Sequence, residues 1–470
     1  MIDILALYLV NNETAMLTDI VCQQARLARD ARFDGLFFTA VKSTGIYCRP
    51  VCPARAPAEH QVSYYFSAAA AVAAGYRPCL RCRPDSAPGS AAWQGSQTTL
   101  QRALRLIDEG GLQQHSQAAL AERLGISERY LRKLFQQQLG LAPKQYALTQ
   151  QVLFAKKLLH ETALPVSSIA FQAGFNSVRR FNDAFKQQLQ LNPTAIRRRS
   201  NTAVDALELE LSYRPPLAWQ KMLQFWQART LDGIDWTGPQ HYGRTFNYRG
   251  QPGWFDVAPL TKTSLKLRLH WQGKQGLFNL VQHIRRLLDL DANMLLIEQQ
   301  LAASPLFAGG IISGLRIPGL WDSWEAGVRA VLGQQVNVAG ARTQLNRLVQ
   351  ALGEPLDADK KLFPTPQAVL DSDLLMIKVP NARRDTLKAL AQFVIAQPQA
   401  EPQQWLALKG IGPWTVNYAK LRGMSDSDIW LAGDLGVQKA LLKAGGVADT
   451  AALSPWRSYA TFQLWFSLGD

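Results

Sequence analysis

Four of the five cysteines in this 470-residue chain form two close pairs, and such pairs can hold a metal ion. Thiolates separated by two or three residues can close a tetrahedron around one zinc ion, which turns the intervening chain into a metal-held loop. Two disulfides or four unrelated thiols are the alternatives. A closed four-thiolate site is ordinarily structural, because it leaves no open position for a substrate. The spacing favours a zinc site made of Cys48, Cys52, Cys79 and Cys82.

A second candidate for chemistry is Asp434, which stands in LAGDLGV at the expected start of a helix. Upstream, in LKGIGPW, Gly410 and Gly412 permit a tight hairpin between helices, and Pro413 suits the first turn of the next helix. The backbone N–H groups of such a hairpin, together with the positive end of the helix, can clamp a phosphate without reading sequence. Capping its own helix is the alternative role for Asp434.

The composition indicates a polyanionic partner. The formal charge is +15, and neutralising phosphates with such an excess releases condensed counterions. A basic surface that binds nothing is the alternative. No apolar run reaches the roughly 18–20 residues that span a bilayer, so no membrane partner is expected. The opening segment has no basic start and no small-residue cleavage site, and Met16 offers a second start, so residues 1–15 are a candidate for an unused extension. The clustered cysteines favour the reducing cytoplasm.

The elements that must position these residues fall into three zones, which predict a multidomain α+β fold. Residues 1–92 hold all the cysteines and predict a small zinc-stapled α/β domain, followed by a Pro/Gly/Ser-rich linker at about 85–96. Helical periodicity over 97–200 predicts an all-α domain. Residues 206–470 open with strand-like alternation, as in LELELSY and SLKLRLHW, and become helical from about Phe278. This zone predicts an antiparallel β subdomain plus helical subdomains.

The middle zone contains two helix-turn-helix patterns. The first has Gly125 at the turn and Ser127 as the expected N-cap. The second has Gly174 at the turn, with Asn176 or Ser177 as the cap. Arginines on the two second helices could read guanine edges or only hold phosphates. A helical bundle with a solvated basic face is the alternative. The first expected DNA-facing set is Glu128, Arg129 and Arg132, and the second is Ser177, Arg179 and Arg180.

The residues around the cysteines resemble the N-terminal methyltransfer domain of the Ada proteins of the alkylation response. The resemblance covers about residues 30–86 and rests on KSTGIYCRPVCPAR and AAGYRPCLRCRPD. It implies that Cys48 takes a methyl group from a methylphosphotriester in DNA, while the other three cysteines complete the zinc site. Zinc keeps a thiolate deprotonated at neutral pH, and the thiolate is the nucleophile. Four thiolates on one zinc carry a net charge of −2, so we expect methylation of one thiolate to tighten DNA binding.

Residues 97–199 resemble the AraC-type DNA-binding domain, chiefly through GFNSVRRFNDAFKQQLQLNPTAIRR. Ada proteins carry these two modules in the same order. The resemblance implies promoter DNA as a partner and RNA polymerase as the partner of an activator; we expect a monomer. Full Ada proteins also carry an O6-methylguanine transferase with a PCHR active site. No cysteine follows Cys82, so direct repair of that lesion is not expected.

From about Leu211 to Trp465 the chain resembles the helix-hairpin-helix glycosylases, and most of all their AlkA branch, 3-methyladenine DNA glycosylase II. The resemblance rests on YRPPLAW, GLRIPGLWDSWEAGVRAVLGQQVNVAGA, PWRSYATFQLW and the Asp434 region. It implies that Asp434 is the catalytic carboxylate on double-stranded DNA. Ile317 would be the wedge that fills the gap left by a flipped base, where the family has leucine. The implied base pocket is Trp414, Tyr418, Trp465 and Phe225, and core packing is the alternative for each of these aromatic residues.

Two further features bear on the mechanism. Bifunctional glycosylases place a Schiff-base lysine where this chain has Trp414, so we expect base excision without strand cleavage. Relatives with an iron–sulfur cluster need four cysteines after the catalytic aspartate, and this chain has none there, so no cluster is expected. Two other functions stay open: a regulator whose C-terminal part binds lesions without catalysis, and a glycosylase whose other parts only add DNA affinity.

Overall fold

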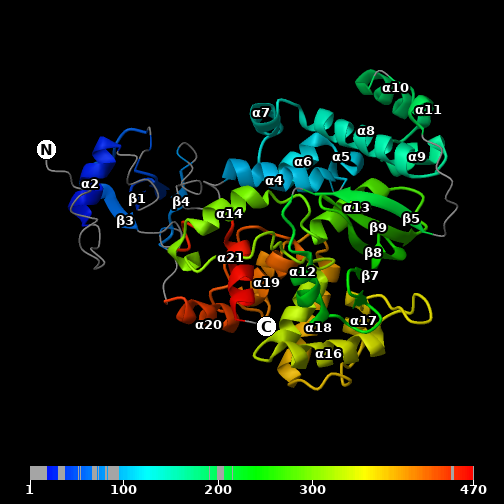
Figure 1. Cartoon of the computed structure of the whole chain (residues 1–470). Helices are drawn as coiled ribbons and strands as arrows, with labels where there is room; N and C mark the ends of the chain where they lie inside the picture. Colours follow the sequence, from blue (N-terminus) through cyan, green and yellow to red (C-terminus); the bar gives the residue numbers. More distant parts are fainter. Residues whose placement is uncertain are drawn as a thin grey trace. The chain divides into compact units, whose positions relative to one another are not determined.

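The computed structural model of the chain (Figure 1) describes most of its residues. The chain divides into two compact units. The first unit comprises residues 1–106 and 116–142, and the second comprises 107–115 and 143–470. The proposed extension 1–15 and most of the linker at 85–96 lie outside the described residues. The described ranges are 18–29, 37–50, 52, 54–65, 71, 74–79, 82, 95–108, 110–189, 191–197, 206–213, 215–445 and 449–468.

A four-stranded sheet of order β3-β1-β2-β4 forms the cysteine-bearing part of the first unit. Its strands are β1 (Phe38–Val41), β2 (Ile46–Cys48), β3 (Val62–Tyr65) and β4 (Arg77–Pro78), and a short helix, η2 (Glu59–Gln61), leads into β3. β1 pairs antiparallel with β2 and β3, and β2 pairs parallel with β4. Among the described residues of this part, the buried core of the sheet is small, and helix α2 (Asp19–Ala28) packs a second small cluster around Cys22 and Phe37. Cores of this size generally need a staple such as a metal ion.

The first helix-turn-helix also belongs to the first unit. It consists of α6 (Gln117–Arg123) and α7 (Glu128–Leu139), preceded by α4 (Gly95–Asp108). Gly125 has a φ of +69° at the turn, a conformation that glycine adopts without strain. The predicted N-cap is confirmed, because Ser127 Oγ accepts a hydrogen bond of 3.1 Å from the Tyr130 N–H.

The second helix-turn-helix belongs to the second unit. Gly174 turns the chain between α9 and α10 with a φ of +87°. Of the two predicted caps, the structure selects Ser177, whose Oγ accepts from the Arg180 N–H at 3.3 Å. The helices of this part are α5 (Gly111–Gln114), α8 (Pro143–Glu161), α9 (Val166–Gln172), α10 (Val178–Leu189) and α11 (Pro193–Ile196).

A five-stranded antiparallel sheet of order β5-β9-β8-β7-β6 follows along the chain. The alternation in LELELS turns Leu209 and Leu211 inward, and these residues pair in register with Leu267 and Leu265 on β9. Helices α12 (Trp219–Gln227) and α13 (Leu277–Leu287) belong to the same part of the chain. The strands are β5 (Leu207–Ser212), β6 (Asp235–Thr237), β7 (Tyr242–Tyr248), β8 (Gln251–Thr261) and β9 (Ser264–Trp271).

The remaining helices form two hydrophobic cores, one around α15–α19 and one around α14, α20 and α21. Their bounds are α14 (Met294–Ala302), η4 (Pro305–Phe307), α15 (Ser323–Gly333), α16 (Val338–Leu352), α17 (Pro366–Asp371), α18 (Asn381–Ala396), η5 (Pro402–Ala407), α19 (Pro413–Gly423), α20 (Leu435–Lys443) and α21 (Arg457–Ser467). The predicted multidomain α+β fold is confirmed. Among the helices described, none combines the length and apolar content that a membrane span requires.

Candidate zinc centre, glycosylase site and DNA-binding helices

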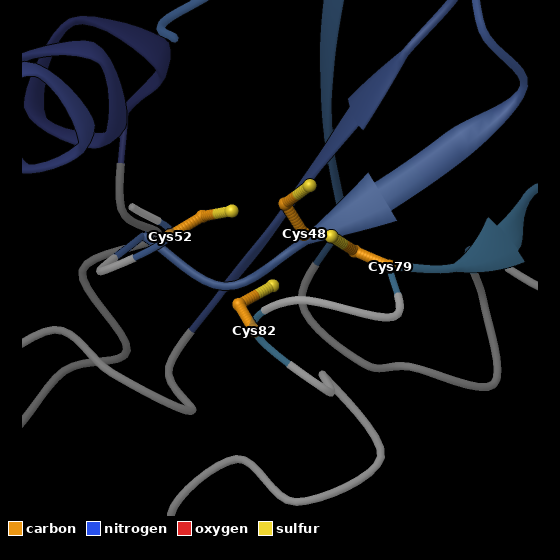
Figure 2. Close-up of side chains that lie close together, drawn as sticks. All are labelled: Cys48, Cys52, Cys79 and Cys82. Carbon is orange, nitrogen blue, oxygen red and sulfur yellow. The ribbon is translucent and has the colours of Figure 1, made fainter. Parts of the chain in front are cut away.

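The four predicted metal ligands meet at the end of β2. Their Sγ atoms all lie within 4.8 Å of one another, and none of the five cysteines is in a disulfide. Figure 2 shows the four side chains turned toward a common centre. Cys79 and Cys82 are buried, whereas Cys48 and Cys52 are half-buried. The donor set and its spacing fit one tetrahedral zinc ion, with two of the sulfurs nearer to solvent.

Hydrogen bonds and burial set the thiol chemistry of this cluster apart from that of ordinary cysteines. The Cys48 thiol donates to Cys82 and lowers the pKa of Cys82 to about 6, helped by the Arg49 N–H, which donates to its Sγ at 3.3 Å. The same hydrogen bond raises the pKa of Cys48, and burial raises the pKa of Cys52 to about 11. So many thiolates cannot share this space unless a cation neutralises them, which is what zinc supplies.

The predicted hairpin lies between η5 and α19. Gly410 has a φ of +87°, and a Cβ added there would lie 2.1 Å from Thr386 Oγ1, so only glycine fits. Gly412 is the N-cap residue of α19, and Pro413 is its first helical residue, as expected. The hairpin is exposed at Gly410, where a phosphate can approach the start of the helix.

Asp434 caps α20 and accepts hydrogen bonds from two tryptophans. Its Oδ1 accepts from the Val437 N–H at 3.0 Å and from Trp465 Nε1 at 2.9 Å. Its Oδ2 accepts from Trp414 Nε1 at 3.1 Å. Asp434 is therefore a helix cap, as the alternative interpretation expected, but it also has two partners that a cap does not need. Three donors from three helices hold this half-buried carboxylate in one orientation.

Two of the four predicted pocket aromatics, Trp414 and Trp465, contact this carboxylate, and Tyr418 and Phe225 pack against these two rings. Trp414 and Tyr418 lie on α19 with ring centroids 5.4 Å apart, and both are half-buried. Trp465 stacks over Phe225 with an interplanar angle of 18° and a centroid distance of 6.2 Å. Phe225 itself is buried, and the guanidinium of Arg229 lies 3.8 Å from its ring centroid. Phe225 therefore packs against one face of the Trp465 ring and supports it.

A buried arginine that the sequence did not single out lies under the same aromatic group. Arg422 Nε donates to Pro318 O at 2.6 Å, and its Nη1 donates to the Tyr418 hydroxyl at 3.2 Å. Its guanidinium lies 4.7 Å from the Phe225 ring centroid. Burial lowers its pKa. Its position four residues after Tyr418 on α19 was the available signal, since residues four apart share one helix face.

The prediction that Ile317 is the wedge is corrected by its position. The side chain is fully buried in the core around α14, α20 and α21, and its N–H donates to Asp289 Oδ2 at 3.1 Å. A side chain that enters a base stack must reach the molecular surface, and this one is fully buried within an apolar cluster. Exposing the Ile317 side chain would bring its apolar surface into contact with water, which is unfavourable, so the side chain stays buried.

A different turn presents exposed apolar side chains beside the hairpin. Between α15 and α16, Gln335 adopts a φ of +56°, and Val336 is 46% exposed. Gln334 Nε2 donates to Gly410 O at 3.0 Å and to Thr415 Oγ1 at 3.1 Å, which fastens this turn to the hairpin. The sequence signal was the run GQQVNV, in which a valine stands among turn residues.

The predicted DNA-facing arginines are exposed on both recognition helices. Arg129 and Arg132 lie on α7, and Arg179 and Arg180 lie at the start of α10. Arg132 forms an ion pair with Glu128 one turn away. Exposed arginines near a helix N-terminus can reach phosphates or base edges of a duplex.

Comparison with known proteins agrees with this arrangement. Three family models match the chain: the metal binding domain of Ada at residues 21–85, a helix-turn-helix domain at 120–199, and the AlkA N-terminal domain at 208–322. A Mycobacterium tuberculosis (strain H37Rv) protein, "Probable bifunctional transcriptional activator/DNA repair enzyme AlkA", is 36% identical over 476 residues, covering 95% of this chain and 96% of that protein. The chain belongs to this bifunctional Ada–AlkA family.

Shorter relatives match the two halves of this Ada–AlkA family member separately. DNA-3-methyladenine glycosylase 2 of Escherichia coli K12 is 30% identical over 277 residues, which covers 55% of this chain and 97% of that enzyme. The E. coli K12 bifunctional transcriptional activator/DNA repair enzyme Ada is 38% identical over 161 residues, which covers 34% of this chain and 43% of Ada. The expected Ada-type zinc centre, helix-turn-helix and AlkA-type parts are thereby confirmed, and the four cysteines are the zinc ligands of the Ada-type part.

Proposed function

We propose that this Ada–AlkA protein excises alkylated bases of the 3-methyladenine and 7-methylguanine type from duplex DNA with Asp434. The same chain repairs methylphosphotriesters with Cys48 and regulates transcription. The observation that carries the glycosylase proposal is the Asp434 carboxylate, oriented by the indole N–H groups of Trp414 and Trp465 beside a helix-hairpin-helix turn. A residue needed only as a helix cap requires no such additional donors.

The reaction depends on the charge of the damaged base. Alkylation at N3 or N7 makes a purine formally cationic, so it leaves as a neutral molecule with little general-acid help. As the glycosidic bond breaks, the Asp434 carboxylate stabilises the positive charge that develops on the sugar, or orients the water that attacks C1′. A cationic base is attracted to the faces of Trp414 and Tyr418 by about 0.5–2 kcal/mol per ring.

Three features of the chain complete this monofunctional mechanism. Trp414 occupies the place of a Schiff-base lysine, so the product is an abasic site in an intact strand. Gly410 and Gly412 present the hairpin to a DNA phosphate. The exposed turn at Gln335 and Val336 takes the wedge role that Ile317 cannot perform, because it reaches solvent and is fastened to the same hairpin by Gln334.

At the zinc centre, Cys48 is the methyl acceptor. Its Sγ attacks the methyl carbon of a methylphosphotriester, a C–S bond forms, the C–O bond breaks, and the phosphodiester anion leaves. Zinc, when bound, keeps this sulfur in the thiolate state. Cys48 is half-buried and lies at the end of β2, whereas Cys79 and Cys82 are buried. Methylation changes the centre from a net charge of −2 to −1, which weakens its repulsion of DNA phosphate.

The regulatory part of the proposal concerns the two helix-turn-helix units. Arg129 and Arg132 on α7, and Arg179 and Arg180 on α10, bind promoter DNA. Methylated protein activates transcription through RNA polymerase. The reduced thiols favour the cytoplasm as the compartment, and a monomer is sufficient because one chain carries both units.

Release of methylated purines from alkylated duplex DNA tests the glycosylase proposal. Wild type releases bases without nicking the strand. Asp434→Asn keeps an oxygen for the Val437 N–H and loses nearly all release. Asp449→Asn is the matched control, because Asp449 accepts backbone N–H bonds of 3.0 and 3.2 Å at an exposed turn elsewhere. Equal release by wild type and Asp434→Asn contradicts the assignment. A folded wild type that releases nothing favours a regulator that binds lesions without catalysis.

A further inference from the structure

The second helix-turn-helix and the five-stranded sheet lie side by side within the second unit (Figure 1), and their buried residues share one hydrophobic core. Buried residues of α8, α9 and α10 and those of β5, β8, β9 and α13 form a single cluster. Phe154 on α8 packs edge-on against Phe278 on α13, with ring centroids 5.2 Å apart. Both rings are buried. A continuous apolar core of this kind is typical of a permanent interface, since separating its two sides would expose it to water.

Gln172, the last residue of α9, bridges this interface with both ends of its amide. Its Nε2 donates to Gly273 O at 2.7 Å, and its Oε1 accepts from the Leu277 N–H at 3.2 Å. Gln172 is 8% exposed. Leu277 is the first residue of α13, so its N–H has no acceptor within its own helix. A buried amide satisfied on both sides by one partner fixes the register of that partner, because any slip leaves buried polar groups unpaired.

Three further hydrogen bonds cross the same interface. Asn279 on α13 is fully buried, and its Nδ2 donates to Asp108 O at 2.6 Å. On β5, the Glu210 N–H donates to Glu161 Oε2 at 2.9 Å, and Glu210 O accepts from the Lys157 ammonium. Both chain segments of the helix-turn-helix part within this unit, 107–115 and 143–197, are thus bonded to the glycosylase half.

The interface continues in both directions toward functional residues. On one side, Phe181 of α10 packs against Phe175 at 5.3 Å, which holds the helix that carries Arg179 and Arg180. On the other side, Arg286 in the last turn of α13 donates to Gly423 O at 3.1 Å, at the end of the helix that carries Trp414 and Tyr418. Helix α13 therefore connects α9 with α19.

We infer that the second helix-turn-helix is docked on the glycosylase as a DNA-holding surface for base excision, and that Arg179 and Arg180 grip phosphates of the duplex being repaired. This inference rests on the proposed glycosylase function. Because α10 is rigidly docked, its binding to DNA raises the effective concentration of the same duplex at the active site. Neither part has to bind the duplex in a separate encounter. Each phosphate neutralised adds affinity through counterion release.

Hydrogen exchange in the full-length protein tests the docking. The Leu277 amide is protected in wild type and exchanges at least about tenfold faster in Gln172→Ala, which removes its acceptor. Gln136→Ala, which removes an exposed glutamine contact to Gly140 O elsewhere, is the control and leaves the protection unchanged. Free exchange of Leu277 in wild type overturns the docked arrangement. The amides of β8 and β9 report whether either variant has unfolded.

Binding to damaged duplexes tests the grip, and is measured by fluorescence anisotropy on protein that carries Asp434→Asn so that no turnover occurs. Arg179→Glu with Arg180→Glu weakens binding at least about tenfold on a duplex of about four helical turns, and less than about twofold on one of about one turn. The slope of log affinity against log salt falls by about 1 to 2. Lys221→Glu with Lys262→Glu, an equal charge change at two exposed lysines away from α10, is the control.

The two proposals fail in different ways. Unchanged affinity and salt slope in the double arginine variant on the long duplex overturn the DNA grip, whatever the catalytic activity. Absence of base release by wild type contradicts the glycosylase proposal. The anisotropy measurement still reports in that case how much Arg179 and Arg180 of α10 contribute to DNA affinity. In catalytically active protein, Arg179→Glu with Arg180→Glu removes the grip and raises the half-saturating enzyme concentration of single-turnover release. Gln172→Ala with Phe154→Ala, which weakens the docking, reproduces part of that rise.

Discussion

The Trp414 indole Nε1 donates a hydrogen bond of 3.1 Å to Asp434 Oδ2, across twenty positions of sequence. Trp414 is the second residue of α19, and Asp434 is the N-cap residue of α20. The positive end of α20 and two indole N–H groups thus converge on Asp434. This convergence holds the carboxylate where a developing positive charge on a sugar can be stabilised.

Replacing Trp414 by phenylalanine tests the contribution of this hydrogen bond. Trp414→Phe keeps an aromatic face and removes the N–H donor. A hydrogen bond to a charged group contributes about 1.5–3 kcal/mol, so we expect single-turnover base release to slow by about 10- to 100-fold. Trp236→Phe is the control, because Trp236 Nε1 donates to Asp256 Oδ2 at the same 3.1 Å, outside the site. Similar losses in both variants would contradict a specific role for Trp414.

The correction of the wedge residue leads to opposite expectations for two apolar residues. Val336→Asn removes an exposed apolar side chain, so we expect release from a paired duplex to fall about tenfold, and release from a mismatched, more easily flipped base to fall less. Ile317→Val removes a buried methylene, so it costs about 0.5–1.5 kcal/mol of stability and leaves the rate of release unchanged. Single-turnover release and denaturant unfolding separate the two effects. A larger loss of release in Ile317→Val than in Val336→Asn would restore the original assignment.

Acid stability depends on a buried ion network at Glu325. Arg244 Nη2 lies 2.7 Å from one oxygen of Glu325, and Arg329 Nη2 lies 2.8 Å from the other. Burial opposes ionisation of Glu325, but the two arginines outweigh it and lower its pKa to about 2. A carboxyl group whose pKa is lower in the folded than in the unfolded protein stabilises the fold at pH values above its pKa in the unfolded chain. This stabilisation is lost as the pH falls toward its pKa in the folded protein.

Glu325→Gln therefore has a pH-dependent cost. The buried Arg244 guanidinium loses its carboxylate partner, and Arg329 keeps only one carboxylate, Asp235 at 3.3 Å, so we expect a loss of about 3–5 kcal/mol at neutral pH. Denaturant unfolding from about pH 7 down to about pH 2 should find this difference constant above the ordinary carboxyl pKa of 4.5 and shrinking below it. A difference that grows on acidification would contradict the ion pairing.

Zinc removal should inactivate the cysteine-bearing part and leave base excision by the glycosylase half intact. The described part of the cysteine-bearing sheet buries only a small apolar core, so the metal supplies much of its stability. A chelator should abolish methyl transfer to Cys48 and the hydrogen-exchange protection of strands β1, β2 and β3. Base release, which depends on the large cores around α14–α21, should continue. Loss of base release together with the metal would show that excision needs the zinc centre.

Local spacing was enough to predict several features of the fold and the sites. The pairs Cys48/Cys52 and Cys79/Cys82 need only short turns to bring their sulfurs together, so their spacing predicted the metal site. Gly410 and Pro413 are restricted by backbone conformation, which is a property of the residues themselves. Ser127 was predictable as a cap because its acceptor and the donor lie within one turn.

Residue type alone misled at Ile317. An apolar residue in a loop fits either a wedge or a core, and the choice depends on whether neighbouring chain covers it. The structure buries Ile317 among α14, α20 and α21, and leaves Val336 in the open. The same limit applied to Phe225, whose buried place beneath Trp465 follows from stacking between α12 and α21.

The sequence by itself determined the modules of this Ada–AlkA protein, their order, the zinc ligands and the carboxylate. These features depend on residue types a few positions apart. Only the tertiary structure decided which donors meet Asp434, which turn is exposed beside the hairpin, and that Gln172 joins α9 to α13. Those contacts link residues 20 to 105 positions apart. The packing of whole helices and sheets sets such distances, because no local backbone preference reaches that far along the chain.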